Sequence, residues 1–499
     1  MRRSIVKDTI ILTAVQMLLD GAGLLVNVLL TRWLGASGVG VLTLTGAFFR
    51  LACMIAGGNA FLCVSRFVSE ELGKPVRDPG KVLGICIGVS LMLSLVCCVL
   101  LRIFAKSAAE YFLHDAALGD AIRLLALVLP AVTLAACLKG WHNALCKAGI
   151  CAAADGLEFL LRSGVMLLLA FLRHPTDAGA LCRLTAWSAL ISAAGEILLL
   201  LLCMPAARAG RTGTASLGLK RYLRLAIPVM AGSALTSLLS AANDALVPVT
   251  LRQSGAGVEE ALADFGLFEA IILPALFFPS TILCALAGIL VTESARARAA
   301  GNRSRIITLS RKTISQTLCF AVFVTLVLFR SGARLGEVLG GGAQAGAMIR
   351  LLAPVVPFIY LEIVLESIIK GLGEQGFSSF NYLAEYAIRI GIVLLCIPLM
   401  GFPGLVLSYY ASNIAGNLAR MILVCKKTGM RFEWWEMLGK PLFAAVFSDQ
   451  MSRMLFLLIG VQAEGNAAAL LLYLLLCGLG YLWVIHALTF PTKSVIMEV

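Results

Sequence analysis

The chain consists of long apolar runs separated by short breaks that carry charge, glycine or proline. A helix of about 20 apolar residues is long enough to cross about 30 Å of hydrocarbon. The runs are continuously apolar rather than alternating, which disfavours membrane strands. With 60% apolar and 14% charged residues among 499, the chain holds more apolar surface than a soluble core of its size could bury. The sequence therefore predicts an all-α polytopic membrane protein.

Fourteen membrane spans are predicted from the apolar runs. They are 8–33, 38–65, 81–104, 119–145, 150–172, 182–207, 222–250, 262–292, 312–330, 346–370, 378–400, 403–425, 440–460 and 467–490. An even number of spans places both termini on one side of the membrane. When the Lys and Arg residues within six positions of a span end are counted with the adjoining break, 27 of the 41 lie on that side and 10 on the other. Because basic residues concentrate in cytoplasmic loops, both termini are expected to be cytoplasmic.

The sequence contains an internal repeat in which Glu385 stands 227 positions after Glu158. The repeated pattern is Glu158, Arg162 and Gly164 in the first copy, and Glu385, Arg389 and Gly391 in the second. This offset spans six predicted helices, so both copies have the same orientation and form a parallel repeat. We predict an N-lobe over 1–207, a cytoplasmic linker over 208–221, a C-lobe over 222–425 and a two-helix appendage over 426–499.

Several charged residues lie inside the predicted spans, where each costs about 2.5 to 3.5 kcal/mol at a helix centre. They are therefore expected to face partners or water. Glu158 with Arg162, Glu385 with Arg389, and Asp449 with Arg453 are each four residues apart, so each pair shares a helical face. We interpret the Asp449 pair as structural. For the repeated pairs, a structural role and a place on a cavity wall both stay open.

Arg50 lies in the middle of the second span, and its own span has no acid at helical spacing. A guanidinium that faces an internal cavity suits a phosphate, which it binds through two hydrogen bonds. This position indicates a phosphate-bearing substrate. An equally weighted alternative is a pair with Asp20, Glu269 or another acid across the cavity.

Oxygen-bearing side chains on two spans predict a cation site. Asn381 precedes Glu385 by one helical turn, and Asp244 lies on the seventh span. Hard cations take oxygen ligands, so these three residues could bind Na⁺ or carry a proton. The alternative is that Asn381 only caps its helix.

The sequence lacks the motifs of the common soluble chemistries. It contains no Walker A motif, no histidine pairs at metal-ligand spacing and no Ser/His/Asp arrangement, so neither an enzyme nor a resident cofactor is expected. The 15 cysteines lie mostly in apolar runs without a CxxC motif and are read as packing residues. The net charge of +13 falls in the breaks between spans, which favours membrane lipids over nucleic acid as partners.

Diffuse helix motifs give the chain a family resemblance. They are the segments 30–40 (LTRWLGASGVG), 65–71 (SRFVSEE), 225–229 (LAIPV), and 265–267 (FGL) with 273–280 (LPALFFPS). With these segments the chain resembles the multidrug/oligosaccharidyl-lipid/polysaccharide (MOP) exporter superfamily, and within it the stage V sporulation protein B-like polysaccharide flippases. The resemblance runs along nearly the whole chain.

The resemblance implies two six-helix lobes in a V, alternating access, and transfer of a lipid-linked saccharide of the undecaprenyl pyrophosphate type across a bacterial cell membrane by a monomer. It implies a substrate cavity with an arginine on the second span, where Arg50 lies. From their charge inside the spans we predict Asp20, Glu158, Arg162 and Glu269 as further cavity residues. Some members carry a Na⁺ site whose pattern Asp244, Asn381 and Glu385 match, with Glu in place of Asp. The arginine-rich first helix of the lipid II flippases is not matched, since the first span carries Asp20.

Two other functions fit the same sequence. A cation-coupled multidrug exporter of this fold would need an acidic cavity and a small apolar pocket. A scaffold that recruits envelope-synthesis enzymes would transport nothing.

Overall fold

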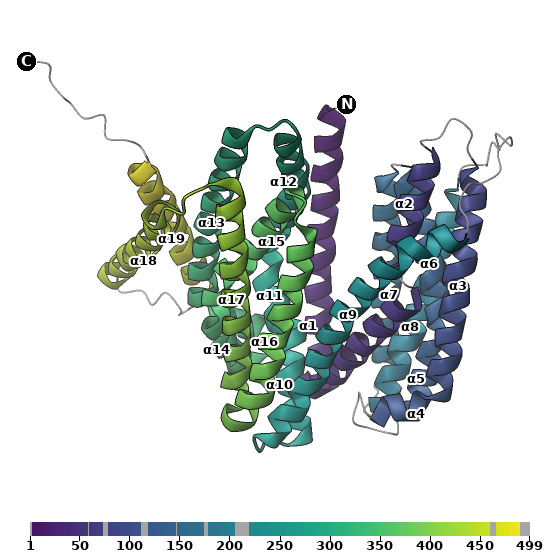
Figure 1. Cartoon of the computed structure of the whole chain (residues 1–499). Helices are drawn as coiled ribbons and strands as arrows, with labels where there is room; N and C mark the ends of the chain where they lie inside the picture. Colours follow the sequence, from purple (N-terminus) through teal and green to yellow (C-terminus); the bar gives the residue numbers. More distant parts are fainter. Residues whose placement is uncertain are drawn as a thin grey trace, which may run out of the picture. The chain divides into compact units, whose positions relative to one another are not determined.

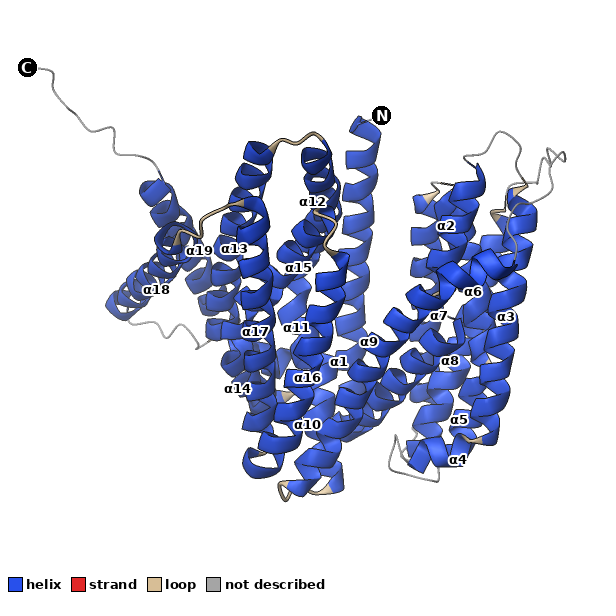
Figure 2. Cartoon of the chain, in the orientation of Figure 1, coloured by secondary structure: helices blue, strands red, loops and turns tan. Residues whose placement is uncertain are grey.

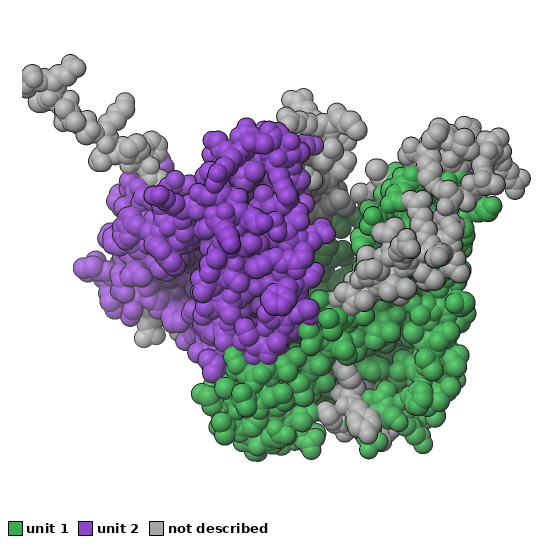
Figure 3. All heavy atoms as spheres, viewed as in Figure 1, with its two compact units in different colours: residues 1–270, 389–405 green, residues 271–388, 406–499 purple. Residues whose placement is uncertain are grey.

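The computed structural model describes residues 2–57, 59–72, 78–110, 118–145, 147–173, 178–204, 219–459 and 466–489 (Figure 1). Within these ranges the chain is helical apart from short connections, and no strand occurs (Figure 2). The all-α prediction is confirmed. The described chain divides into two compact units, shown in Figure 3. Unit 1 comprises Met1–Ala270 and Arg389–Leu405, and unit 2 comprises Ile271–Ile388 and Val406–Val499.

Unit 1 contains the first ten helices. They are α1 (Arg2–Gly57), α2 (Ala60–Leu72), α3 (Pro79–Ile103), α4 (Ala105–Ala108), α5 (Gly119–Ala126), α6 (Val128–Ala144), α7 (Ala148–Arg173), α8 (Ala178–Leu202), α9 (Leu219–Gln253) and α10 (Val258–Leu267). Helix α1 is broken at Gly35, whose φ of 74° and ψ of 168° are not helical. Glycine adopts this conformation readily because it has no Cβ. The break therefore separates the first two predicted spans.

Small residues allow α1 and α10 to pack closely within unit 1. A Cβ added to Gly40 would collide with the Leu262 carbonyl, and one added to Gly266 would lie 2.5 Å from the Ala36 carbonyl oxygen. Membrane helices approach this closely where small residues line both faces. Gly40 and Gly266, which lie in two of the segments that carry the family resemblance, thus have a packing role.

Unit 2 contains the remaining helices, with α16 and α17 beginning or ending in unit 1. They are α11 (Leu273–Phe277), α12 (Thr281–Ala299), α13 (Arg303–Val338), α14 (Gly342–Leu352), α15 (Val356–Gly371), α16 (Gln375–Met400), α17 (Phe402–Thr428), α18 (Lys440–Ile459) and α19 (Ala467–Thr489). The loop between α15 and α16 is tied to α17, because Lys427 donates a 2.6 Å hydrogen bond to Glu374. That bond lowers the pKa of the partly exposed Glu374 carboxyl.

Helices α18 and α19 are held by a polar contact with α13. Arg330 Nε on α13 donates to Asp449 Oδ1 at 2.6 Å, and the Tyr473 hydroxyl on α19 donates to the same oxygen at 2.8 Å. The predicted Asp449–Arg453 pair was wrong, because Arg453 is exposed and Asp449 turns toward Arg330 instead. Asp449 is buried, so the largely buried Arg330 on the neighbouring helix stabilises its carboxylate more than the exposed Arg453 would.

Within the described residues, helices occupy most of each predicted span, and eleven segments are long and apolar enough to cross a membrane. This is compatible with fourteen spans, since the segment Val15–Leu72 overlaps the first two predicted spans, and α7 and α17 coincide with two predicted spans outside the eleven segments. The span predicted over 262–292 is interrupted by a π-helical turn (Phe268–Ile272) and a 3₁₀ turn (Phe278–Ser280). The chain is a multi-pass membrane protein. The predicted lobes stay a prediction, and most of the linker 208–221 lies outside the described residues.

Candidate functional site

A cavity of about 420 Å³ lies within unit 1 and is lined by α1, α2, α6 and α9. Its lining side chains that carry oxygen or nitrogen are Arg50, Asn59, Thr133, Ser237, Ser240 and Asp244. The rest of the described lining is apolar or sulfur-containing. The cavity is therefore an apolar space with a few polar groups, which is the usual composition of a ligand pocket.

The polar groups reach the cavity through local helix geometry. Ser237, Ser240 and Asp244 stand three and four residues apart, so α9 presents them on one face. Asn59 lies in the connection between α1 and α2 with φ of 55°. Asparagine tolerates this left-handed conformation better than most residues. Gly57 and Asn59 thus form part of the cavity wall.

Arg50 and Asp244 form the charge pair of this cavity. Arg50 Nη2 lies 3.9 Å from Asp244 Oδ2, and the side chains are 68% and 11% exposed. Asn243 Nδ2 donates to Asp244 Oδ1 at 3.4 Å, and Arg389 also interacts electrostatically with this carboxylate. Of the two readings of Arg50, a pair with an acid across the cavity is observed, although its guanidinium stays largely exposed.

The pair predicted for the first repeat copy is formed. Arg162 Nη1 lies 3.2 Å from Glu158 Oε1 on α7, and both side chains are partly exposed. Arg162 also interacts electrostatically with Cys53, which lines the cavity. Of the five predicted cavity residues, Arg50 lines this cavity, and Glu158, Arg162, Asp20 and Glu269 do not. Asp20 is exposed and accepts a hydrogen bond from Gln16, and Glu269 is half-buried in the π-helical turn.

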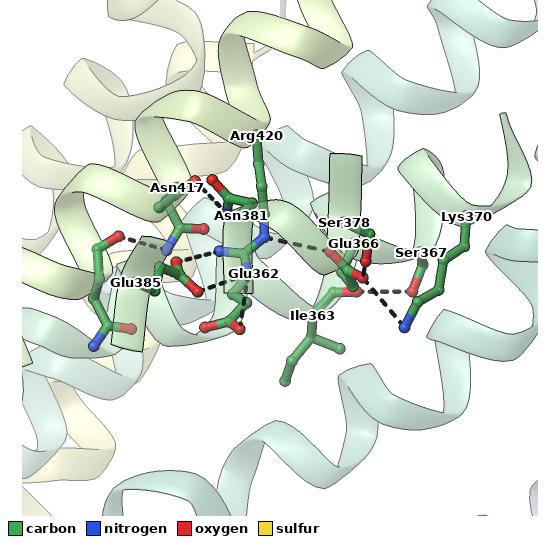
Figure 4. Close-up of polar contacts among 12 residues, drawn as sticks. Glu362, Ile363, Glu366, Ser367, Lys370, Ser378, Asn381, Glu385, Asn417 and Arg420 are labelled. Carbon is green, nitrogen blue, oxygen red and sulfur yellow. Dashed lines mark hydrogen bonds and ion pairs between the residues drawn. The ribbon is translucent and has the colours of Figure 1, made fainter. Parts of the chain in front are cut away.

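Unit 2 contains a buried ionic cluster centred on Arg420 of α17 (Figure 4). Arg420 has no exposed surface and donates to Glu385 Oε1 at 2.6 Å and to Glu385 Oε2 at 2.9 Å. It also donates to Glu362 at 3.2 Å and to Glu366 at 3.4 Å, and it stacks over the Tyr382 ring. The guanidinium thus joins three carboxylates from α15 and α16.

Further polar groups surround the Arg420 cluster. Glu366 accepts a hydrogen bond from Ser378 and lies 3.2 Å from Lys370 Nζ. Asn381 Nδ2 donates to the Gly416 carbonyl at 3.3 Å, and Asn417 Oδ1 is buried with no hydrogen-bond partner. Figure 4 shows Asn381 and Asn417 beside the guanidinium. The cluster therefore holds one buried acceptor oxygen whose hydrogen-bonding capacity is unused.

Unit 1 has a smaller cluster around Lys139 of α6. Lys139 Nζ lies 2.6 Å from Asp155 Oδ1 on α7 and 2.7 Å from Glu196 Oε1 on α8. The lysine is 23% exposed and Glu196 is almost buried. Each compact unit thus contains one cation that joins acids from neighbouring helices.

Arg420 and Lys139 were not among the residues predicted from the sequence. Each lies within six residues of the end of its predicted span, where a basic side chain normally extends to the lipid headgroups. The internal repeat carries a signal for Lys139, which aligns with Glu366 at the same offset of 227, but none for Arg420, which aligns with Ala193. A charged residue at that place in both copies indicates a polar interior.

In the described part of the chain, no group of three or more His, Cys, Asp and Glu side chains is arranged to hold a metal ion. Glu385, predicted as a cation ligand, has both oxygens bonded to Arg420. The oxygens left for a cation near it are those of the two amides, Asn381 and Asn417. Asp244 lies in the cavity described above.

Comparison with known proteins matches the chain to a family and to a curated relative. Residues 5–257 match the family described as polysaccharide biosynthesis protein. Stage V sporulation protein B of Bacillus subtilis (strain 168) is 21% identical over 445 residues, which cover 85% of this chain and 84% of the relative.

Solved structures of transporters share the fold. The lipid II flippase MurJ in an inward closed conformation gives a TM-score of 0.70 at 12% identity, over 96% of this chain and 98% of MurJ. A MOP superfamily transporter from Pyrococcus furiosus gives 0.60 at 15% identity, over 85% and 97%. A MATE transporter in complex with MaD3S gives 0.57 at 13% identity, over 85% and 96%. These likenesses establish a MurJ- and MATE-like fold.

Proposed function

The chain belongs to the polysaccharide biosynthesis protein family, and from this premise we propose that it is an alternating-access flippase. It moves a lipid-linked oligosaccharide or cell-wall precursor from the inner to the outer leaflet. The observation that carries the proposal is the largely exposed guanidinium of Arg50 in a cavity within membrane-spanning helices. The shared fold with transporters supports it.

The cavity suits the head of such a lipid. A guanidinium binds a phosphate through two charge-assisted hydrogen bonds, so Arg50 would engage the pyrophosphate. Hydroxyls and an amide, those of Ser237, Ser240 and Asn59, line the same space and would contact the sugar. The polyprenyl tail would stay in the bilayer. Binding of this kind, without bond cleavage, makes the protein a transporter rather than an enzyme.

The carrier lipid that we propose is of the undecaprenyl pyrophosphate type. The setting is the bacterial plasma membrane with both termini in the cytoplasm, as the distribution of basic residues favours. The protein would act as a monomer.

We also propose coupling to Na⁺ or H⁺. The coupling residues would be Asp244 in unit 1, and Asn381 and Glu385 in unit 2. The buried Asn417 Oδ1 without a partner is the type of oxygen that a hard cation prefers. Because Arg420 binds both oxygens of Glu385, a cation there must compete with the guanidinium. A coupling ion acts only if its affinity differs between the two transport states.

A transport assay in proteoliposomes tests the flippase. A short-chain prenyl pyrophosphoryl saccharide with a fluorescent label would become accessible to a membrane-impermeant quencher on the far side. We expect transport by the wild-type protein and a loss of about tenfold or more in Arg50→Gln, because one charge-assisted contact is worth about 1.5 to 3 kcal/mol. Full transport by Arg50→Gln would overturn the role of this arginine.

The two alternative functions give other results in the same vesicles. Export of a cationic dye in place of the saccharide would identify a multidrug exporter, for which the MATE-like fold is also suited. Movement of neither compound would favour a scaffold.

A further inference from the structure

The contact between Arg50 and Asp244 is too long for a hydrogen bond. The 3.9 Å between Nη2 and Oδ2 exceeds the 2.7–2.9 Å of a charge-assisted N–H···O bond. The N–H donors of Arg50 are therefore available to another anion, while Asp244 stays close enough to be its alternative partner. The two side chains differ in freedom, since Arg50 is 68% exposed and Asp244 is 11% exposed.

We propose that Asp244 is the competing counter-ion of Arg50, which takes the guanidinium back from a bound phosphate and so lets the substrate leave the cavity. The proposal rests on the proposed function, because it assumes a phosphate at Arg50. It makes Asp244 a positioning residue that sets affinity and release through Arg50.

Burial gives Asp244 its effect. A ligand that draws Arg50 away leaves a nearly buried carboxylate with less cationic compensation, and a buried charge without its partner is unfavourable. Asn243 and Arg389 still face Asp244 and reduce this penalty without removing it. The penalty for separating Asp244 from Arg50 weakens substrate binding. It disappears when the substrate leaves and Arg50 pairs with Asp244 again.

A transporter needs such a balance. Its site must bind the substrate firmly enough to load and weakly enough to unload. Arg50 without a counter-ion would hold a pyrophosphate tightly, and it would also attract the phosphates of the surrounding lipids. Asp244 lowers the affinity for all of these anions by the same electrostatic effect.

The test compares binding and transport in Asp244→Asn, which removes the charge and keeps the shape. The full-length protein in nanodiscs is titrated with a short-chain prenyl pyrophosphoryl N-acetylglucosamine, and the same probe is used in proteoliposomes. We expect a Kd lower by about tenfold and a maximal transport rate lower by a similar factor, as for loss of one partly screened charge interaction. Asp244→Glu should behave as the wild type.

Controls separate this effect from a structural defect. Asp120→Asn removes the charge of an exposed carboxylate that pairs with Arg123 outside the cavity, and it should alter both constants less than threefold. Asp244→Ser is measured beside the amide variant, so that poor folding of one variant does not decide the result. Tighter binding cannot arise from partial unfolding.

The outcomes distinguish this inference from the proposed function. Weaker or unchanged binding of the probe in both neutral variants, with a transporting wild type, would overturn the role of Asp244 alone. A wild type that neither binds nor moves the probe would overturn the proposed function. Competition by inorganic pyrophosphate would show that the phosphates are recognised, and competition by farnesol would show that the tail is.

Discussion

Glu158 and Glu385 occupy equivalent places in the two copies of the internal repeat, but the structure gives them different partners. Glu158 is 25% exposed and pairs with Arg162 of its own helix. Glu385 is 9% exposed and receives two hydrogen bonds from Arg420 of a neighbouring helix. The same acid thus serves as a local, partly hydrated pair in unit 1 and as part of a buried cluster in unit 2.

The cations of the two clusters stand at different positions of the repeat. Lys139 of α6 aligns with Glu366 of α15, which is an acid in the cluster of unit 2. Arg420 of α17 aligns with Ala193 of α8. Duplication therefore kept charged side chains between the same helices while the sign at a given position changed. The polar interior is the shared property, and the partners are specific to each copy.

Replacement of Arg420 should have the largest effect. Arg420→Met leaves three carboxylates without their shared cation, and removing one partner of a buried ionic group costs about 3 to 5 kcal/mol. The free energy of unfolding, measured by SDS titration of the purified protein, should fall by this amount. In Lys139→Met the free energy of unfolding should fall by less, because Lys139 is partly exposed to water.

Two results would contradict this difference between the clusters. One is an Arg420→Met protein as stable as the wild type. The other is a Lys139→Met protein that loses more stability than Arg420→Met. Adding Glu385→Gln to Arg420→Met should recover part of the loss, since it removes one uncompensated charge.

A glycine gives a smaller and more local test. A Cβ at Gly416 would collide with the carboxylate of Glu385. Gly416→Ala should therefore displace Glu385 from Arg420 and lower the free energy of unfolding by about 1 to 3 kcal/mol. Gly391→Ala is the matched control, because a Cβ there meets nothing within 4 Å. Equal stability of the two alanine variants would disprove the close approach.

The smallest effect is expected at the partly exposed pair of unit 1. Glu158→Gln should change the free energy of unfolding by about 0 to 1 kcal/mol, as for other solvated ion pairs. Glu385→Gln should change it by more in the same titration. If both substitutions had the same effect, the contrast between the copies would disappear.

Much of the fold was predictable from the sequence because hydropathy determines which segments enter the membrane. The spans, the break at Gly35 and the Glu158–Arg162 pair all follow from local spacing. The Arg420 cluster does not, because its members come from three helices and local spacing is silent on contacts between helices. Asp449 illustrates the same limit, since Arg453 four residues away was chosen in place of Arg330, 119 residues away.

The candidate site was predictable in part for a related reason. Arg50 was identified because an arginine in the middle of an apolar span needs a partner or a ligand. Its contact with Asp244 could not be chosen among several acids, because the sequence does not place α9 beside α1. The sequence shows which charged residues lie inside the membrane, and the structure is needed to show which of them pair.

The most direct test of the account identifies the lipid that the protein carries. Native mass spectrometry of the protein purified in mild detergent should find a polyprenyl pyrophosphate-linked saccharide bound to the wild type and to the control variant Gly391→Ala. The same lipid should be absent from Arg50→Gln. If the wild type carried only glycerophospholipids, or if Arg50→Gln retained the saccharide lipid equally well, the assignment of this cavity to a lipid-linked pyrophosphate would be contradicted.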